Sequence, residues 1–227
     1  MNPYLKHIFP INIYHGTVED NAAIKKQMLP LIEKYGNKHN FAPEGWLTNH
    51  LKTSFEDDDF NYMMMDKTTD IGKLLIEQYL TTLGKFFDTN FSIEITDMWY
   101  NLYSNGEYQE AHTHFGNWRK QNHFACIHFL SYNPEIHSPL KLHDPSRHIR
   151  VSSFEFFDGR SYADYVDVNA REGDFIMIPA YLEHEVNPGQ PTPDYPRITI
   201  SFNLRVADID IGAVSYTHLT LPTIMPV

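Results

Sequence analysis

The sequence has a single cysteine, Cys126, among its 227 residues. One thiol cannot form a disulfide within the chain, so a packed core must stabilise the fold. No apolar run approaches the roughly 20 residues that a membrane-crossing helix needs. The first residues, MNPYLKHIFPINIYHG, also lack the basic-then-apolar order of a secretory signal. These absences predict a soluble, cytoplasmic protein that does not associate with membranes.

Positive charge is also scarce. The chain has 18 Lys and Arg against 29 Asp and Glu, which gives a formal net charge of -11. Proteins that bind nucleic-acid backbones do so with Lys and Arg that neutralise phosphates, so this balance argues against a general nucleic-acid-binding protein. A small-molecule substrate and a macromolecular substrate both stay open, and the composition does not indicate an oligomeric state.

The overall composition is that of one well-cored domain, with 42% hydrophobic and 14% aromatic residues. We expect this domain to span residues 1–212. The last segment, AVSYTHLTLPTIMPV at 213–227, does not continue the preceding pattern and resembles the translation of a sequencing-library transposon adapter. We interpret it as a non-native tail and leave it out of the fold prediction. A genuine C-terminal strand is the alternative, because THLTLPTI has some β character.

Two segments in the first 90 residues have the periodicity of amphipathic helices. Residues 19–35 space Ile24, Met28 and Ile32 at helical intervals, and residues 67–88 carry a longer apolar stripe. That stripe comprises Ile71, Leu74, Leu75, Tyr79, Leu83, Phe86 and Phe87. Between the two helices, residues 36–66 predict an irregular region whose acidic run EDDDF forms a solvated face. Residues 1–90 are therefore expected to be a helical and loop support.

Beyond residue 91 the chain consists of short β-rich runs separated by Gly, Pro, Asn and Asp. The runs are FSIEITDMWYNLY, NHFACIHFLSY, SPLKLHD, IRVSSFEFF, YVDVN, DFIMIPAYLEHEV and RITISFNLRV. Helices followed by strands predict an α+β fold. We expect a β core over residues 91–206, a barrel or two-sheet jelly roll, with the N-terminal helices buttressing one face.

Two histidines in the motif EAHTHF are candidate metal ligands. His112 and His114 are two residues apart, and the two-residue period of a strand would place both imidazoles on one face. Such a pair can reach one ion. On its own, a His-x-His pair in a chain with 13 histidines also fits surface or hydrogen-bonded histidines.

A second group begins in the run GDFIMIPAYLEHEV, which contains His184 near its end. Arg197 opens the strand-like run RITISFN, and the strand period places Thr199 and Ser201 on its face. A guanidinium beside hydroxyl groups suits a carboxylate, because it offers a fork of donors. Binding of an acidic co-substrate is one interpretation, and a surface salt bridge is the other.

Tyr103 precedes His112 by nine residues, with Gly106 between them. A strand, a tight turn and a second strand would bring Tyr103 and His112 to neighbouring positions that face one interior. Tyr103 could then donate a hydrogen bond to the co-substrate, or it could be a core tyrosine.

In this order the motifs resemble a known family. YxxGxxxxxHxH, then HFLSYNP, LHDP, GDFIMIPxxLxH and RITISFN, looks like the 2-oxoglutarate and Fe(II)-dependent oxygenases, and is most similar to a bacterial and phage branch that carries an HxH motif. The similarity extends over about residues 95–205. It implies a double-stranded β-helix, a jelly-roll or cupin-like barrel.

The resemblance also implies roles for individual residues. His112 and His184 would bind Fe(II), and Arg197 with Thr199 would bind the far carboxylate of 2-oxoglutarate. The reaction would be hydroxylation of a substrate that the sequence does not identify, with release of succinate and CO₂. Ascorbate would be an accessory reductant.

The chain departs from the superfamily at His114, where the superfamily has Asp or Glu. We expect His114 to be the third ligand, with Asp144 and Glu110 as the other candidates. The departure leaves two further hypotheses open. One is a three-His iron dioxygenase that does not use 2-oxoglutarate. The other is a non-catalytic protein on the same fold, such as a phage structural or host-interaction protein.

Overall fold

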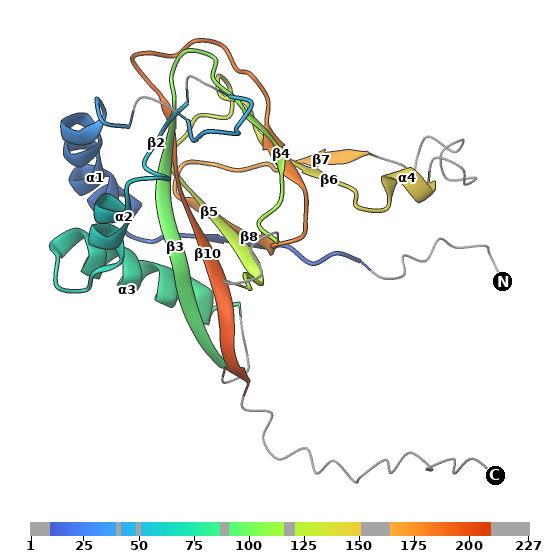
Figure 1. Ribbon diagram of the computed structural model, residues 1–227, viewed down its shortest axis with the longest axis horizontal. Coiled ribbons are helices and arrows are strands. Elements are labelled where there is room, and N and C mark those ends of the chain that lie inside the picture. Colours follow the sequence, from blue (N-terminus) through green and yellow to red (C-terminus); the bar gives the residue numbers. More distant parts are fainter. Residues whose placement is uncertain are drawn as a thin grey trace, which may run out of the picture.

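The computed structural model describes residues 10–39, 42–48, 51–86, 91–115, 121–150 and 164–209. The larger of its two sheets has six antiparallel strands in the order β1-β8-β5-β10-β3-β2. Their bounds are β1 Tyr14–Thr17, β8 Asp174–Pro179, β5 Phe124–Ser131, β10 Arg197–Ile209, β3 Phe91–Tyr103 and β2 Lys52–Thr53. The long strands β3 and β10 pair along most of their length and form the centre of the molecule (Figure 1).

The smaller sheet has four antiparallel strands in the order β4-β9-β6-β7. Their bounds are β4 Gln109–His112, β9 His184–Val186, β6 Leu140–His143 and β7 Tyr165–Asp167. The short helix α4 (Arg147–Arg150) follows β6. Among the described residues no strand pairs with both sheets, so of the two expected arrangements, a barrel or a two-sheet jelly roll, the two-sheet arrangement is found and no closed barrel is formed.

Three helices precede the main strands: α1 (Asn21–Tyr35), α2 (Asp58–Met65) and α3 (Asp70–Gly84). In Figure 1 they lie together on one side of β3 and β10, and the smaller sheet lies on the other side. None of the described helices has both the length and the apolar character that crossing a membrane requires.

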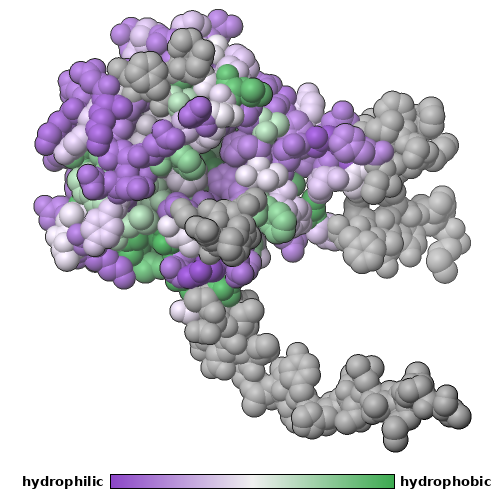
Figure 2. Space-filling model, in the orientation of Figure 1, coloured by the Kyte–Doolittle hydropathy of each residue, from purple (hydrophilic) through white to green (hydrophobic). Residues whose placement is uncertain are grey.

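The hydrophobic residues of the described part of the chain form two cores. The first joins the apolar stripes of the helices to one face of the larger sheet; it includes Met28 of α1, Leu75 and Tyr79 of α3 and Phe202 of β10. The second lies between the two sheets and includes Phe129 of β5. Hydrophilic residues cover most of the face drawn in Figure 2. Most residues of the predicted helical stripes are buried, namely Ile24, Met28, Ile32, Ile71, Leu75, Tyr79 and Leu83. Leu74 and Phe86 are half-buried against the same core, Phe86 lies beyond the end of α3, and Phe87 lies outside the described residues.

The region 36–66 is more ordered than its composition indicates. It contains β2 and α2, and Asp57, in the acidic run, accepts a hydrogen bond from the backbone N–H of Phe60 at the start of α2. Asp57 also accepts from His39 (2.8 Å) and forms an ion pair with Lys38 (2.6 Å). The prediction that the whole run is a solvated face was therefore wrong at Asp57, which is 9% exposed.

Three further predictions concern the connection after β3, the run IRVSSFEFF and the C-terminal tail. The expected tight hairpin between Tyr103 and His112 is not formed, because β3 and β4 belong to different sheets and the intervening residues cross from one to the other. Within the run IRVSSFEFF, Ile149 and Arg150 belong to helix α4, and the remaining residues, 151–157, lie outside the described residues. The proposed non-native tail at 213–227 also lies outside them.

Candidate metal and co-substrate site

The alternation of residues along β10 creates the site. Ile198, Ile200 and Phe202 point toward the helices and belong to the first core. The residues between them point the other way, into a cavity between the two sheets with a volume of about 370 Å³. These cavity-lining residues of β10 are Arg197, Thr199, Ser201 and Asn203. The cavity is within the size range of sites for small molecules and cofactors.

Three histidines converge on this cavity. His112 is the last residue of β4, His184 is the first residue of β9, and the two are register partners across these strands. His114 lies just beyond the end of β4. Each offers a ring nitrogen, and the three nitrogens lie within 4.8 Å of one another. The structure thus brings together the three residues that the sequence singled out as candidate ligands.

Hydrogen bonds fix the ring orientation of all three histidines. The Nδ1 of His112 donates to the carbonyl oxygen of Glu110 (2.7 Å), and the Nδ1 of His184 donates to that of Leu182 (2.9 Å). The Nδ1 of His114 lies 2.5 Å from the side-chain oxygen of Asn203. Since carbonyl oxygens only accept, Nδ1 carries the proton in each ring and Nε2 is left with a lone pair. This is the usual arrangement of histidines that bind metals.

Burial also keeps these rings neutral. It lowers the pKa of His112 and, together with the neighbouring histidines, lowers the pKa of His184 well below the ordinary value. Burial, aided by repulsion from His112, lowers the pKa of His114 to about 4. Neutral imidazole is the form that coordinates a metal, so the donor set fits a divalent transition-metal ion.

The other two candidates for the third ligand do not join this cluster. Glu110 lines the cavity, but one of its carboxylate oxygens accepts from the backbone N–H of Leu47 (3.1 Å). Asp144 lies in the turn after β6, where it accepts from the backbone and hydroxyl of Ser146. Among the described residues, the group that could hold an ion consists of the three histidines.

Arg197 occupies a different part of the same cavity wall. It is 3% exposed, and its guanidinium carbon lies 4.7 Å from the ring centroid of Tyr103 and 5.7 Å from that of Tyr132. Burial lowers the pKa of Arg197, and Tyr103 and Tyr132 oppose this effect. A guanidinium nevertheless stays protonated in proteins.

Two donor atoms of Arg197, Nε and Nη1, are buried without a hydrogen-bond partner within the described protein. Leaving a buried charged donor unsatisfied is costly, which points to a missing anionic partner. Thr199 lines the cavity two residues farther along β10, with a hydroxyl that can add a hydrogen bond. Tyr103 faces the same cavity and is the register partner of Arg197 on β3. The arrangement suits a carboxylate.

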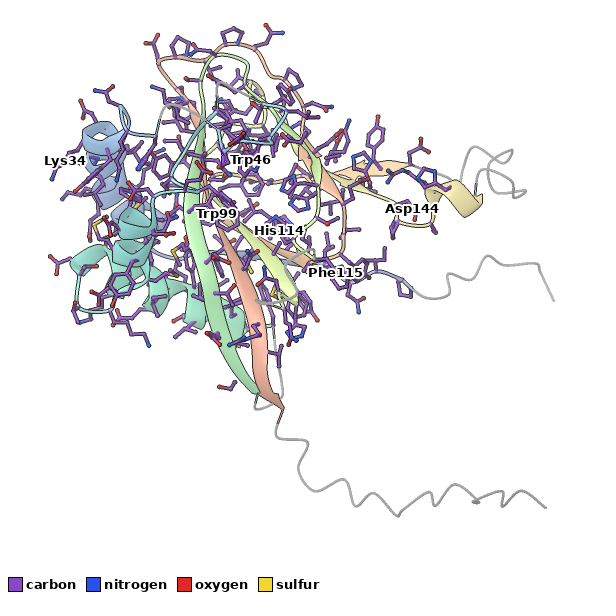
Figure 3. The ribbon with its side chains drawn as sticks, in the orientation of Figure 1. Lys34, Trp46, Trp99, His114, Phe115 and Asp144 are labelled. Carbon is purple, nitrogen blue, oxygen red and sulfur yellow. The ribbon has the colours of Figure 1, made fainter. Side chains whose placement is uncertain are left out.

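Aromatic side chains form one wall of the cavity beside His114. The ring of Trp99 stacks on that of His114, with centroids 5.8 Å apart, and Phe55 and Trp46 continue the row at 5.1 Å steps. Figure 3 shows Trp46, Trp99 and His114 near one another around the site. Trp46 belongs to the segment 42–48, and hydrogen bonds of Leu47 hold this segment beside β4. The backbone N–H of Leu47 donates to the carboxylate of Glu110, and the backbone carbonyl of Leu47 accepts from the hydroxyl of Tyr108 (3.0 Å).

Sequence reasoning did not single out Asn203, Asp97 or Trp99 as site residues. The strand period that selected Arg197, Thr199 and Ser201 reaches Asn203 in one further step, so that signal was present. Asp97 and Trp99 lie on β3, and their place in the cavity follows from the pairing of β3 with β10. A single sequence does not specify that pairing.

Comparisons with known proteins identify a related family and a shared fold. Residues 97–203 match the model of a family described as "Putative 2OG-Fe(II) oxygenase". The resemblance to the 2-oxoglutarate and Fe(II)-dependent oxygenases is confirmed. The matched segment contains all three histidines, Tyr103, Arg197 and Thr199. The family's description supports an oxidoreductase. The bacterial and phage branch, and the HxH motif as its mark, stay predictions. No curated protein matches this chain.

Solved structures of 2-oxoglutarate oxygenases share the fold at low sequence identity. A Trichoplax adhaerens prolyl hydroxylase in complex with a hypoxia inducible factor peptide fragment has a TM-score of 0.54 and 12% identity, covering 85% of this chain and 82% of that chain. The viral collagen prolyl hydroxylase of Paramecium bursaria Chlorella virus-1, solved as a 2OG complex, has a TM-score of 0.52 and 9% identity, covering 86% of this chain and 96% of that chain. EctD from S. alaskensis with bound Fe has a TM-score of 0.50 and 14% identity, covering 86% of this chain and 73% of that chain. The double-stranded β-helix is thus supported as the fold of this chain.

Proposed function

We propose that this protein is a 2-oxoglutarate- and Fe(II)-dependent dioxygenase that hydroxylates a substrate. His112, His114 and His184 would hold Fe(II) through Nε2. Arg197 and Thr199 would bind the far carboxylate of 2-oxoglutarate, and Tyr103 would orient the guanidinium. When bound, Fe(II) and 2-oxoglutarate supply the oxidising power, because one atom of O₂ enters the substrate C–H bond and the other enters succinate as CO₂ is released.

One observation carries this proposal: a neutral three-histidine cluster and a buried arginine with two unpartnered donors line a single cavity. A metal would satisfy the lone pairs of the histidines, and an anion would satisfy the guanidinium. A 2-oxoglutarate molecule has two carboxylates, one that could bind a metal held by the histidines and one that could bind Arg197. The cavity wall formed by Trp46, Phe55 and Trp99 would then face the substrate.

Anaerobic addition of 2-oxoglutarate to the Fe(II)-loaded protein tests the co-substrate. We expect a visible metal-to-ligand charge-transfer band. Arg197→Ala should raise the 2-oxoglutarate concentration needed for half of the band by about 10- to 100-fold, because a hydrogen bond to a charged group contributes about 1.5–3 kcal/mol. Arg205→Ala is the matched control. Arg205 lies on the same strand but pairs with Glu94 outside the cavity. A wild-type protein that binds Fe(II) and gives no band would overturn the role of 2-oxoglutarate.

Turnover is tested by succinate formation from 2-oxoglutarate, with Fe(II), ascorbate and pooled candidate substrates. The pools should separate small metabolites, peptides, lipids and nucleobases, because the loops around the cavity set the substrate. Succinate that rises with one pool, and a product heavier by one oxygen atom, would support hydroxylation.

A second candidate is a three-His dioxygenase that binds its substrate directly to iron, with Arg197 holding the substrate's carboxylate. The specific observation in its favour is that the third member of the metal cluster is a histidine, where the superfamily has a carboxylate. The charge-transfer experiment separates the two, since this candidate predicts no band with 2-oxoglutarate. Absence of stoichiometric Fe(II) in the wild type would instead favour a non-catalytic binding protein.

A further inference from the structure

His114 differs from the other two histidines in what holds its ring. The Nδ1 atoms of His112 and His184 donate to carbonyl oxygens two residues earlier in their own segments. His114 follows the end of β4, and its Nδ1 donates to Asn203, which is 89 residues away on the opposite sheet. The orientation of the third histidine therefore depends on the other wall of the cavity.

The side-chain amide of Asn203 is itself fixed. Its nitrogen Nδ2 donates to the carboxylate of Asp97 (3.3 Å), the register partner of Asn203 on β3. Asn203 is 6% exposed, so rotation of its amide without a replacement partner would leave a buried polar atom unsatisfied. With Nδ2 directed at a carboxylate, Oδ1 must face His114. His114, Asn203 and Asp97 form a hydrogen-bonded chain with one consistent direction.

We propose that Asn203 is a positioning residue that selects the Nδ1-protonated tautomer of His114 and so presents Nε2 to the metal. Asp97 holds the Asn203 amide in the required orientation. The stack of Trp99 on the His114 ring restricts the remaining rotation of the imidazole. This inference rests on the proposed metal site, but its statement about the His114 tautomer holds in the metal-free protein.

The hydrogen-bonded chain from His114 to Asp97 also places a carboxylate near the proposed metal site. In the superfamily the residue at the position of His114 is a carboxylate that binds the metal. Here the carboxylate of Asp97 lies behind the third ligand, with one amide between them. A carboxylate that accepts from the Asn203 amide polarises that amide and strengthens the hydrogen bond that it accepts from His114. The protein thus has an acidic group behind the third ligand, separated from the metal position by His114 and the Asn203 amide.

The first experiment measures the His114 tautomer in metal-free protein by ¹⁵N NMR, with His114→Gln used to assign the signals. In the wild type we expect a protonated Nδ1 and an unprotonated Nε2. Asn203→Leu keeps a similar side-chain shape but removes the acceptor, so the Nε2-protonated form should become populated. The matched control is Asn122→Ala, because Asn122 bonds His114 only at its backbone carbonyl (3.4 Å) and otherwise accepts a hydrogen bond from Thr96 (2.9 Å). An Nε2-protonated His114 in the wild type, or an unchanged tautomer in Asn203→Leu, would overturn the proposal.

The second experiment measures anaerobic Fe(II) affinity by competition with a chromogenic chelator. Asn203→Leu should weaken Fe(II) binding by about 10- to 100-fold, the usual effect of losing an outer-shell partner. Asn122→Ala should bind as the wild type does. The exchange variant Asp97→Asn/Asn203→Asp rebuilds the chain with its acceptor next to His114, so it should recover most of the affinity. Equal Fe(II) affinity in Asn203→Leu and the wild type would contradict the proposal.

The two experiments distinguish an error in the proposed function from an error in the proposed role of Asn203. If the wild type binds no Fe(II), the proposed function is wrong, and the tautomer measurement still decides whether Asn203 controls His114. If the wild type binds Fe(II) and Asn203→Leu changes neither the tautomer nor the affinity, the proposed function stands and Asn203 has no positioning role. Thermal unfolding of each variant identifies losses that come from misfolding, and the exchange variant separates those losses from a positioning effect.

Discussion

The two faces of β10 are buried to a similar degree but differ in chemistry. Facing the helices, Ile200 and Phe202 are fully buried among apolar side chains. Facing the cavity, Arg197 and Asn203 are 3% and 6% exposed among polar groups. Apolar burial stabilises the fold in proportion to the area removed from water, whereas a buried polar group stabilises only when it is partnered. The first face therefore accounts for stability, and the second face includes Arg197, whose unpartnered donors a ligand can satisfy.

The polar groups on the helix side support this contrast, because they are partnered within the protein. His128, fully buried on β5, hydrogen-bonds Tyr79 of α3 (3.0 Å) and Asn21 of α1 (2.9 Å). His39 bridges Tyr100 of β3 (2.7 Å) and Asp57 (2.8 Å). These hydrogen bonds join helices and loops to the helix-facing side of the larger sheet. The guanidinium on the cavity side keeps two donors without partners in the described residues.

The largest expected effect comes from the apolar face. Phe202→Ala should destabilise the protein by about 3–5 kcal/mol, the usual range for removing a buried aromatic side chain from a core. The measurement is denaturant unfolding at equilibrium. If the folded fraction still binds Fe(II) with wild-type affinity, the two faces of the strand are separable. A loss below about 1 kcal/mol would mean that this face does not carry the stability assigned to it.

A smaller effect on the free energy of unfolding is expected from protonation of Asp57, which lies on the helix side of the larger sheet. Burial alone would raise its pKa, but hydrogen bonds from Lys38 and His39 outweigh this and lower the pKa to about 2. Because the pKa is lower in the folded state than the ordinary value near 3.9, the stabilisation is present above pH 4 and is lost as the pH falls through about 2. It amounts to about 2 kcal/mol.

The comparison for this prediction is Asp57→Asn, which keeps an oxygen that can accept from the N–H of Phe60 but removes the charge. Unfolding measured between pH 5 and pH 2 should show a smaller acid destabilisation in the variant, by about 2 kcal/mol. Parallel pH profiles for the two proteins would show that the Lys38–Asp57–His39 group does not contribute as described.

The smallest effect, and the one of opposite sign, comes from the cavity face. Arg197→Met in the absence of ligands should leave stability unchanged or raise it by about 1 kcal/mol, because removing unsatisfied buried donors gains about 1–3 kcal/mol and losing the aromatic stacking costs about 1–2 kcal/mol. Thermal unfolding measures this. Adding 2-oxoglutarate with Fe(II) should stabilise the wild type more than the variant. A strongly destabilised Arg197→Met would identify this arginine as a structural residue.

Patterns within single elements predicted much of this site. The two-residue period of RITISFN placed Arg197, Thr199 and Ser201 on one face, and helical spacing gave the stripes of α1 and α3. What the sequence did not indicate depends on contacts between distant segments. Asp57 is buried because Lys38 and His39 reach it. Tyr103 and His112 both line the cavity, but they lie on different sheets because the chain crosses between the sheets after β3. His114 reaches the cluster although β4 ends at His112, because Asn203 and Trp99 hold its ring.

The seven residues from Arg197 to Asn203 carry a core face and a site face in alternation. Deleting or inserting one residue within them would exchange the two faces, since every side chain beyond the change would move to the opposite side of the sheet. Isoleucines would enter the cavity, and an arginine or asparagine would enter the helix-side core. Over evolution, this stretch can exchange one residue for another of similar character, but it has almost no freedom to change its length.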